Sequence, residues 1–158
     1  MFSLIAAVDS KYGISKNGKI PWKCPKDMEY FKNITSNNVV IMGRKTWDSL
    51  PNKFRPLPNR INVVISNNKL IKEGNSKPDF IFDNIDYTIE YFSDYKSIYK
   101  DKKLFVIGGA SIYKQFLDNK LITKLHITHM GKDYGCDQFI KLPELNVFNK
   151  FNLCEQDK

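Results

Sequence analysis

The chain has 158 residues, of which 42% are hydrophobic and 13% aromatic, and its formal net charge is +8. This length suits one domain, and this composition is typical of a globular protein rather than a disordered one. No apolar run approaches the roughly 18 residues of a membrane span, and the N-terminus lacks the basic opening of a secretory signal. We therefore expect a cytoplasmic protein with no membrane partner.

The charged and metal-ligating residues exclude several classes of site. The lysines are spread along the chain, so the positive charge favours small anionic partners over nucleic acid, and we expect no nucleic-acid partner. Cys24, Cys136 and Cys154 form no CxxC pair, which predicts reduced thiols. His126 and His129 lie three apart on an expected strand, on opposite faces, and we expect no metal site.

In chain order, the first half of the sequence alternates between strand and helix patterns. Residues 2–8 form an apolar run typical of a buried strand, and a polar loop over 9–22 follows. The later elements of this half are a helix over 25–34, a strand over 39–42 ending at Gly43, a short helix over 46–50, a proline-rich loop, and a strand over 61–66.

The second half continues the same alternation after a polar loop over 67–79. It predicts a strand at 80–82, a helix over 84–99, a strand over 104–107, a helix over 110–118 and a strand over 121–130. Such alternation indicates an α/β fold, with a mainly parallel central sheet and right-handed crossovers, in one domain spanning 1–158.

Two places share the order strand, glycine, helix start. Gly43 leads into Arg44, Lys45 and Thr46, and the pair at 108–109 leads into Ala110 and Ser111. Glycine lets an anion approach the backbone, and helix N-termini carry partial positive charge, so the two places could hold a pyrophosphate together. Neither matches GxGxxG or a P-loop, and a glycine between a strand and a helix is more often only a turn.

Asp27 is the acid that stands out. It lies on the predicted helix beside Met28 and Phe31, near Trp22, where lost hydration would raise its pKa. The alternative is an ordinary first-turn acid stabilised by the helix dipole. The apolar side chains that could line an aromatic-sized slot, or equally belong to the core, are Trp22, Met28, Phe31, Leu50 and Leu57.

Taken together, these segments resemble the dihydrofolate reductase family. The resemblance covers roughly 2–139 and rests on Ser3–Val8, Gly13–Trp22, Asp27 with Phe31, Val39–Trp47, Arg55–Arg60, Val106–Gly109 with Tyr113, and the strand around Thr128. It implies a central, mostly parallel sheet flanked by helices. It also implies NADPH-dependent reduction of 7,8-dihydrofolate to tetrahydrofolate by hydride transfer to C6, in one-carbon and thymidylate metabolism, with antifolates as further ligands.

The resemblance also implies the residues around the substrate. Asp27 would bind the pterin amide and amino groups, aided through Thr128, and would favour the N5-protonated substrate with the proton delivered by water. Trp22 belongs to the same catalytic group, and Arg60 would pair with the glutamate α-carboxylate, which its planar fork matches. The other residues implied around the substrate are Ile5 and Ile107, through their carbonyls, and Ala7, Met28, Phe31, Leu50, Leu57 and Tyr113.

The residues implied around NADPH fall into groups along the cofactor. Those at the nicotinamide are Ala7, Ile14, Ile20 and Gly109. Those at the phosphates are Arg44, Lys45, Thr46 and Ser111. Ser66 and Asn67 would lie near the adenosine end. The set is completed by Ser49, Gly108, Ala110 and Ile112, and in the family the Gly108–Gly109 peptide is cis.

The sequence departs from the family pattern in three places. At one of them Asn67 replaces a more usual phosphate-binding hydroxyl or basic residue, with Lys69 as a candidate substitute. Ser15 stands where the family usually has glycine, and a serine there would cost stability if the position needs a positive φ. The family ends in a long antiparallel hairpin, and after a strand over 147–153 this chain lacks the final strand, so the hairpin is expected to be incomplete. Its edge would be exposed, and the chain could be part of a reductase fused to thymidylate synthase.

Two alternatives stay open, and the departures at Ser15 and at the final strand support only the first. One is a folate- and NADPH-binding protein of the same fold with weak or no turnover. The other is a related reductase that acts on a different pyrimidine or pterin, although Trp22, Asp27 and Arg60 together favour folate.

Overall fold

The computed structural model describes residues 2–67, 77–94 and 97–143, and the backbone of 147–151. Its centre is a seven-stranded sheet in the order β5-β4-β3-β6-β1-β7-β9, and every neighbouring pair is parallel. The strands are β1 (Phe2–Val8), β3 (Val39–Gly43), β4 (Ile61–Ile65), β5 (Phe80–Phe82), β6 (Leu104–Gly108), β7 (Ile122–His129) and β9 (Val147–Phe151). The predicted α/β fold with a mainly parallel sheet is confirmed.

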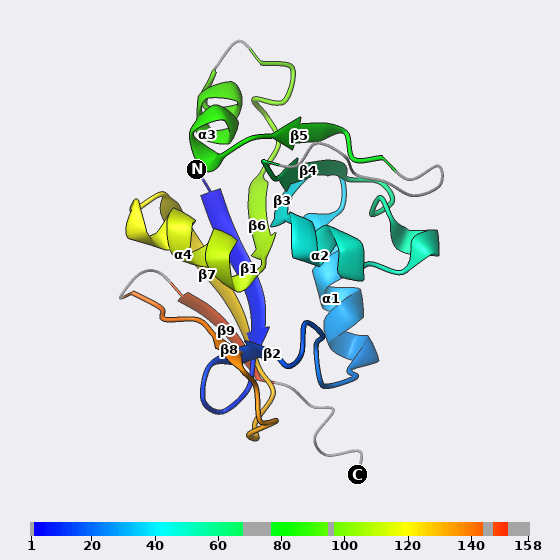
Figure 1. Cartoon of the computed structure of the whole chain (residues 1–158), viewed down its shortest axis with the longest axis vertical. Helices are drawn as coiled ribbons and strands as arrows, with labels where there is room; N and C mark the ends of the chain where they lie inside the picture. Colours follow the sequence, from blue (N-terminus) through cyan, green and yellow to red (C-terminus); the bar gives the residue numbers. More distant parts are fainter. Residues whose placement is uncertain (1, 68–76, 95–96, 144–146, 152–158) are drawn as a thin grey trace.

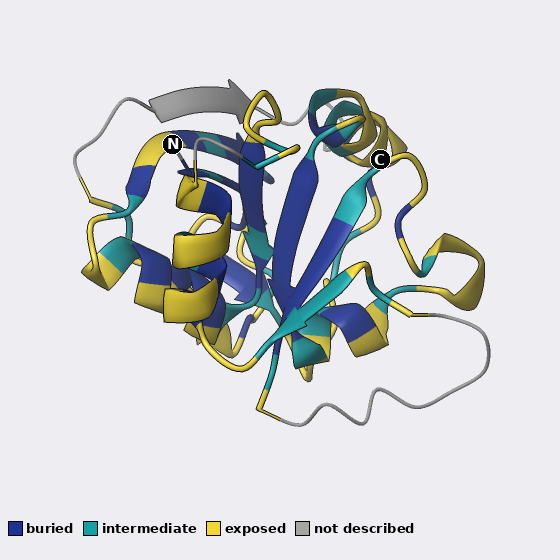
Figure 2. Ribbon diagram, turned by 90° about the horizontal axis from the view of Figure 1, so that it is seen from above, coloured by how far each residue is buried: buried dark blue, intermediate teal, exposed yellow. Residues whose placement is uncertain are grey.

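The central strands are apolar on both faces because helices cover both. Alternate residues point to opposite faces of a strand, so in β1 the residue Leu4 joins one core cluster and Ile5 joins the other. In β3 the same division separates Ile41 from Met42. Figure 2 shows the central strands buried and the outer surfaces of the helices exposed.

Within the described residues, four α-helices flank the sheet. They are α1 (Pro25–Thr35), α2 (Arg44–Ser49), α3 (Ile85–Ser93) and α4 (Ala110–Asp118), with a 3₁₀ turn η1 at Asn52–Phe54. Apolar residues of α3 and α4 pack in one cluster, and those of α1 and α2 pack in the other. Accordingly α4 lies on one side of β1 and α1 and α2 lie on the other (Figure 1).

Two predicted helix boundaries are wrong. The helix expected over 84–99 ends at Ser93, because Ile98, the apolar residue that would continue its buried face, is 83% exposed. The helix expected over 46–50 begins two residues earlier, at Arg44, since Gly43 is extended and serves as its N-cap.

A small antiparallel sheet was not predicted. It joins β2 (Gly13–Ser15), inside the loop over 9–22, to β8 (Gln138–Phe139). The strand predicted over 147–153 is present as β9, and it pairs in parallel with β7, with Leu125 opposite Val147. The expected absence of a final strand falls on positions beyond 151, which lie outside the described residues.

The cysteines also differ from expectation. Cys136 is free and buried. Cys24 is disulfide-bonded, so the prediction of a reduced thiol was wrong for this cysteine.

Candidate active site

Helix α1 carries Asp27 in its first turn. Pro25 occupies the first turn, where proline needs no hydrogen-bond acceptor, and the amides of Asp27 and Met28 donate to the Cys24 carbonyl at 3.0 and 3.1 Å. Asp27 is half-buried. Burial, and then the Asp27 charge, raise the pKa of Tyr30 one turn further along. An acid near a helix N-terminus is stabilised by the helix dipole. The position of Asp27 is therefore compatible with both interpretations drawn from the sequence, a functional acid and an ordinary first-turn acid.

An apolar wall forms on the face of the sheet that α1 and α2 cover. Ile5 and Leu57 are buried in it, and Phe31, Leu50 and Ile107 pack against it while partly exposed. These five predicted substrate residues come from β1, β6, α1 and the segment after α2, and the fold brings them into one cluster. Half-exposed apolar side chains beside a packed core are what the side of a ligand cleft requires.

Met28 and Trp22 stand apart from that wall. Met28 is 65% exposed, so it is not a core residue. Trp22 is half-buried, and its ring meets Tyr134 edge-on with ring centroids 5.2 Å apart. Its packing partner therefore belongs to the segment before β8.

Tyr113 ties α4 to the first strand. Its buried hydroxyl donates to the Ile5 carbonyl at 2.8 Å, and burial raises the pKa of this tyrosine. Two residues further along β1, Ala7 lies opposite Thr128, whose side chain is buried in β7. The carboxyl ends of β1 and β7 thus place Ala7 and Thr128 side by side, at the edge of a parallel sheet where ligands usually bind.

Arg60 is held in place by neighbours. Its Nε donates to the Pro58 carbonyl at 2.9 Å and its Nη1 to Thr35 Oγ1 at 3.2 Å. The guanidinium carbon lies 5.8 Å from the centre of the Phe31 ring. Burial lowers the pKa of Arg60, but an arginine stays charged at neutral pH. A fixed cation therefore stands beside the apolar wall.

Sequence reasoning missed Asn62, which shapes the loop that carries Leu57 and Arg60. Its side chain is fully buried, accepts the Leu57 amide at 2.9 Å and donates to the Leu57 and Arg60 carbonyls at 3.0 and 3.1 Å. An asparagine inside the β-branched run Ile61–Ile65 was the signal, because a buried amide needs hydrogen-bond partners.

The two strand–glycine–helix turns meet, as predicted. A Cβ on Gly43 would lie 2.9 Å from Ile112 Cγ1, and one on Gly108 would lie 3.3 Å from Thr46 Oγ1. Gly108 has φ +135°, which favours glycine. The peptide that joins it to Gly109 is cis, as expected. The start of α2 and the start of α4 therefore face each other across two glycines.

The polar side chains at these helix starts differ in their hydrogen-bond partners and in their exposure. Arg44 Nε lies 3.1 Å from Asp48 Oδ2, while Lys45 is exposed. Ser49 Oγ donates to the Thr46 carbonyl at 2.7 Å, and Ser111 Oγ accepts from Gln115 at 3.1 Å. Of the remaining predicted cofactor residues, Ala110 and Ser66 are half-buried and Asn67 is exposed. The Ser66 amide donates to the Phe82 carbonyl at 2.8 Å.

The loop over 9–22 carries the last predicted residues. Ile14 is 9% exposed in β2, while Ile20 is 64% exposed. Ser15 is in β2, opposite Gln138, and is not among the described non-glycine residues with positive φ. The condition for a backbone cost, a positive φ at this position, is therefore not met, because an extended residue needs no glycine.

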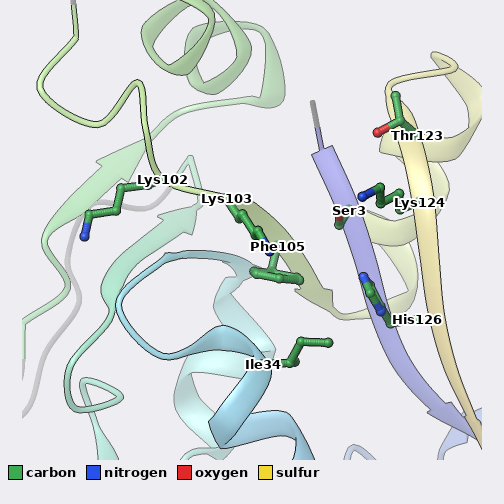
Figure 3. Close-up of a pocket in the computed structure, with 8 residues that line it drawn as sticks. All are labelled: Ser3, Ile34, Lys102, Lys103, Phe105, Thr123, Lys124 and His126. Atoms are coloured by element: carbon green, nitrogen blue, oxygen red, sulfur yellow. The ribbon is translucent and has the colours of Figure 1, made fainter. Parts of the chain in front are cut away.

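A cavity of about 290 Å³ lies on another side of α1 (Figure 3). Its described lining residues are Ser3, Ile34, Lys102, Lys103, Phe105, Thr123, Lys124 and His126. None of these is a predicted folate or cofactor residue, although Ile34 and Phe105 belong to the same apolar cluster as the wall. Burial, and then Lys124 and Lys103, lower the pKa of His126.

In the described part of the chain, no three His, Cys, Asp or Glu side chains are grouped so that they could hold a metal ion. No helix within the same residues has the length and apolar content to cross a bilayer.

The comparisons with known proteins agree with this architecture. The family model described as "Dihydrofolate reductase" matches residues 1–158. A protein named dihydrofolate reductase from Heliothis virescens is 35% identical, over 99% of this chain and 85% of its own length. One of the same name from Pneumocystis carinii is 39% identical, over 89% and 73%. A bifunctional dihydrofolate reductase-thymidylate synthase from Arabidopsis thaliana is 32% identical over 98% of this chain, which spans 29% of that relative.

Proposed function

Since this chain belongs to the dihydrofolate reductase family, we propose that it reduces 7,8-dihydrofolate to 5,6,7,8-tetrahydrofolate, with NADPH as the reductant. The observation that carries this proposal is the half-exposed apolar wall beside the two facing glycine turns, at the carboxyl edge of the sheet. A flat heterocycle suits the wall, and a phosphorylated cofactor suits the turns.

The substrate is proposed to lie against the wall. Phe31, Leu50 and Leu57, with exposed Met28, would pack on the pterin and benzoyl rings. The Ile5 carbonyl already accepts the Tyr113 hydroxyl, and its second lone pair can face the pterin edge together with the Ile107 carbonyl. Tyr113 thereby orients a substrate-binding carbonyl.

Polar groups would fix the two ends of the substrate. Asp27 would bind the pterin amide and amino groups, aided through Thr128, with Trp22 in the same catalytic group. This pairing favours the N5-protonated pterin, and water supplies the proton. At the other end the fixed fork of Arg60 would bind the glutamate α-carboxylate.

The residues present fit the dinucleotide. Gly108 and Gly109 leave backbone accessible where a Cβ would crowd Thr46. NADPH, when bound, supplies the hydride for C6 of the pterin. Arg44, Lys45, Thr46 and Ser111 would bind its phosphates. The other residues proposed around it are Ala7, Ile14, Ile20, Ser49, Ser66, Asn67, Gly108, Gly109, Ala110 and Ile112. Their work is to position the reactants and exclude water.

The loss of absorbance at 340 nm with NADPH and dihydrofolate tests the proposal. We expect the wild type to turn over, and Asp27→Asn to lower kcat/KM by about 10²-fold or more, the usual scale for an acid–base group. Glu29→Gln, an exposed acid on the same helix, is the matched control and should stay near wild type. A wild type that binds an antifolate but does not turn over would support the weakly active binder instead.

The role in metabolism follows from this reaction. Tetrahydrofolate production would supply one-carbon and thymidylate synthesis. Some relatives carry thymidylate synthase in the same polypeptide, and this chain matches 29% of their length. A fused synthase therefore stays a prediction for this protein, and the intact mass of the natural product tests it.

A further inference from the structure

Asp9, immediately after β1, holds a buried carboxylate that the proposed reaction does not use. The residue is 1% exposed. Its Oδ1 accepts the amides of Lys11 and Gly13 at 2.9 and 2.7 Å, and its Oδ2 accepts the amide of Tyr134 at 3.1 Å. The thiol of Cys136 donates a fourth hydrogen bond to the same carboxylate.

The hydrogen-bond donors around Asp9 keep its carboxylate charged. Burial and this charged carboxylate keep the Cys136 thiol protonated. Burial raises the pKa of Asp9, but the four hydrogen bonds outweigh burial, and its pKa lies below the ordinary value. Burial, and then Asp9, raise the pKa of Cys136 to about 11, so its S–H remains a donor at neutral pH. Hydrogen bonds to an ionised acceptor are stronger than neutral ones.

This carboxylate joins two segments that are distant in sequence. One is the loop over 9–22, and the other is the segment over 131–139. Around Asp9, the Ser10 amide donates to the Lys132 carbonyl at 3.0 Å. A Cβ on Gly13 would lie 2.7 Å from Cys136 Sγ, so the two segments pack without a gap.

The same two segments meet again further from Asp9. The Asp137 amide donates to the Ser15 carbonyl at 3.0 Å, and the Asn17 amide donates to Asp137 Oδ2 at 2.9 Å. Trp22, at the far end of the loop, packs on Tyr134. Tyr134 thus offers its amide to Asp9 and its ring to Trp22, which links the start of the loop to its end.

We propose that Asp9 is a positioning residue for the reaction, because its carboxylate fixes the start of the 9–22 loop against the 131–139 segment. This role rests on the proposed function, since that loop carries Ile14, Ile20 and Trp22. Loops over an active site exclude water and complete the reacting geometry. A loop with a loosened start would spend less time in the closed arrangement, which slows hydride transfer more than it weakens folate binding.

The variant Asp9→Asn separates the two halves of the network. The amide oxygen can keep the turn bonds from Lys11 and Gly13. The new NH₂ group then replaces Oδ2 and faces the Tyr134 amide, so two donors meet and the link between the segments is lost. The single-turnover rate of hydride transfer should fall about tenfold, while the KM for dihydrofolate changes less than about threefold.

Asp133→Asn is the matched control. Asp133 joins the same two segments through Lys11, with Nζ 3.4 Å from Oδ2, but both side chains are exposed. Exposed ion pairs contribute little, so this variant should stay within about twofold of wild type in both constants.

Two readouts in the ligand-free protein report the link itself. Hydrogen exchange at the Gly13 and Tyr134 amides, and alkylation of the buried Cys136 thiol, should both accelerate in Asp9→Asn and not in Asp133→Asn. Should Asp9→Asn not fold, Cys136→Ala removes one donor only and should slow hydride transfer about two- to fivefold, with faster exchange at Tyr134.

Three outcomes overturn the proposal in distinguishable ways. If the wild type is active and hydride transfer in Asp9→Asn and Cys136→Ala stays within twofold of it, the positioning role alone is removed. A KM that rises as much as kcat falls would mean general damage to the site. A wild type that reduces no dihydrofolate refutes the proposed function, and the positioning role fails with it, whatever the exchange rates show.

Discussion

Arg60 combines charge with a geometry that other cations lack. Its Nε and Nη1 donate to Pro58 and Thr35, and its guanidinium lies near the Phe31 ring. Lysine would keep the charge but neither the planar fork nor these two anchors. The exact placement of the cation, and not only its presence, should therefore matter for binding the glutamate end of folate.

Arg60→Lys is expected to raise the KM for dihydrofolate by roughly tenfold to a hundredfold, the equivalent of about 1.5–3 kcal/mol for a hydrogen bond to a charged group. The kcat should change little, because the carboxylate is far from the reacting atoms. Steady-state kinetics measure both constants. Arg55→Lys is the control, since Arg55 contacts Asn52 and Trp47 instead. An unchanged KM in Arg60→Lys would remove Arg60 from the binding site.

At the scale of single residues, the sequence identified functional side chains by their residue type. It did not identify buried polar side chains whose role depends on their hydrogen-bond partners. Phe31, Leu50 and Leu57 belong to one apolar cluster, and their contact with the substrate stays a prediction. Asn62 and Asp9 were not predicted, because a buried amide and a buried carboxylate are recognised by their donors, which come from elsewhere in the chain. Ser15 was judged from a residue type, whereas its extended backbone removes the expected strain.

At the scale of elements, Gly43 controls how closely α4 approaches β3. Its φ is −83°, which any residue can adopt, so glycine is needed here for space and not for conformation. A Cβ would lie 2.9 Å from Ile112 Cγ1. Any side chain at 43 must push the start of α4 away from the turn that precedes α2.

Gly43→Ala should lower the free energy of unfolding by about 1–3 kcal/mol, the usual cost of overpacking, and weaken NADPH binding. Urea unfolding and a cofactor titration measure the two effects. Ile112→Ala removes the opposing atoms and also costs stability through a cavity. Because one contact links the two positions, the double variant should be more stable than the sum of the single effects predicts, by about 0.5 kcal/mol or more. Strict additivity would contradict this explanation.

Long elements were predictable because their apolar pattern is periodic. The helix at Pro25–Thr35 and the strand at Phe2–Val8 follow directly from that pattern. Strands β2 and β8 have three and two residues, too few to show a period, and they exist because the loop and the 131–139 segment meet. The apolar pattern does not show which apolar residues become buried, and the helix predicted over 84–99 was therefore too long.

Across the whole molecule, the order of strands could not be read from the sequence. Strand β1, first in the chain, pairs with β6 and β7 near the middle of the sheet. Apolar runs show that a strand is buried on both faces, but they do not say which strand lies beside it. The pairing of β1 with β7 places Thr128 beside Ala7, a juxtaposition that was not predicted.

We expect one histidine to make the stability of the whole protein depend on pH. His126 lies beside Phe105 in the cavity near α1, with ring centroids 5.9 Å apart, and Lys103 and Lys124 line the same cavity. Burial and these two charges lower the pKa of His126 below its ordinary 6.5. The unfolded chain therefore takes up this proton first as pH falls, so the stabilisation is complete above about pH 6.5 and declines from there down to the folded pKa.

The free energy of unfolding should accordingly fall as the pH drops below about 6.5, with a slope of at most about 1.4 kcal/mol per pH unit from this group. His126→Gln removes the titrating group, so its curve should be flatter over that range, whatever its absolute stability. Urea unfolding at a series of pH values measures the slopes. If His126→Gln keeps the wild-type slope, carboxylates and not His126 determine stability in this range, and the cavity at α1 does not disfavour a third positive charge.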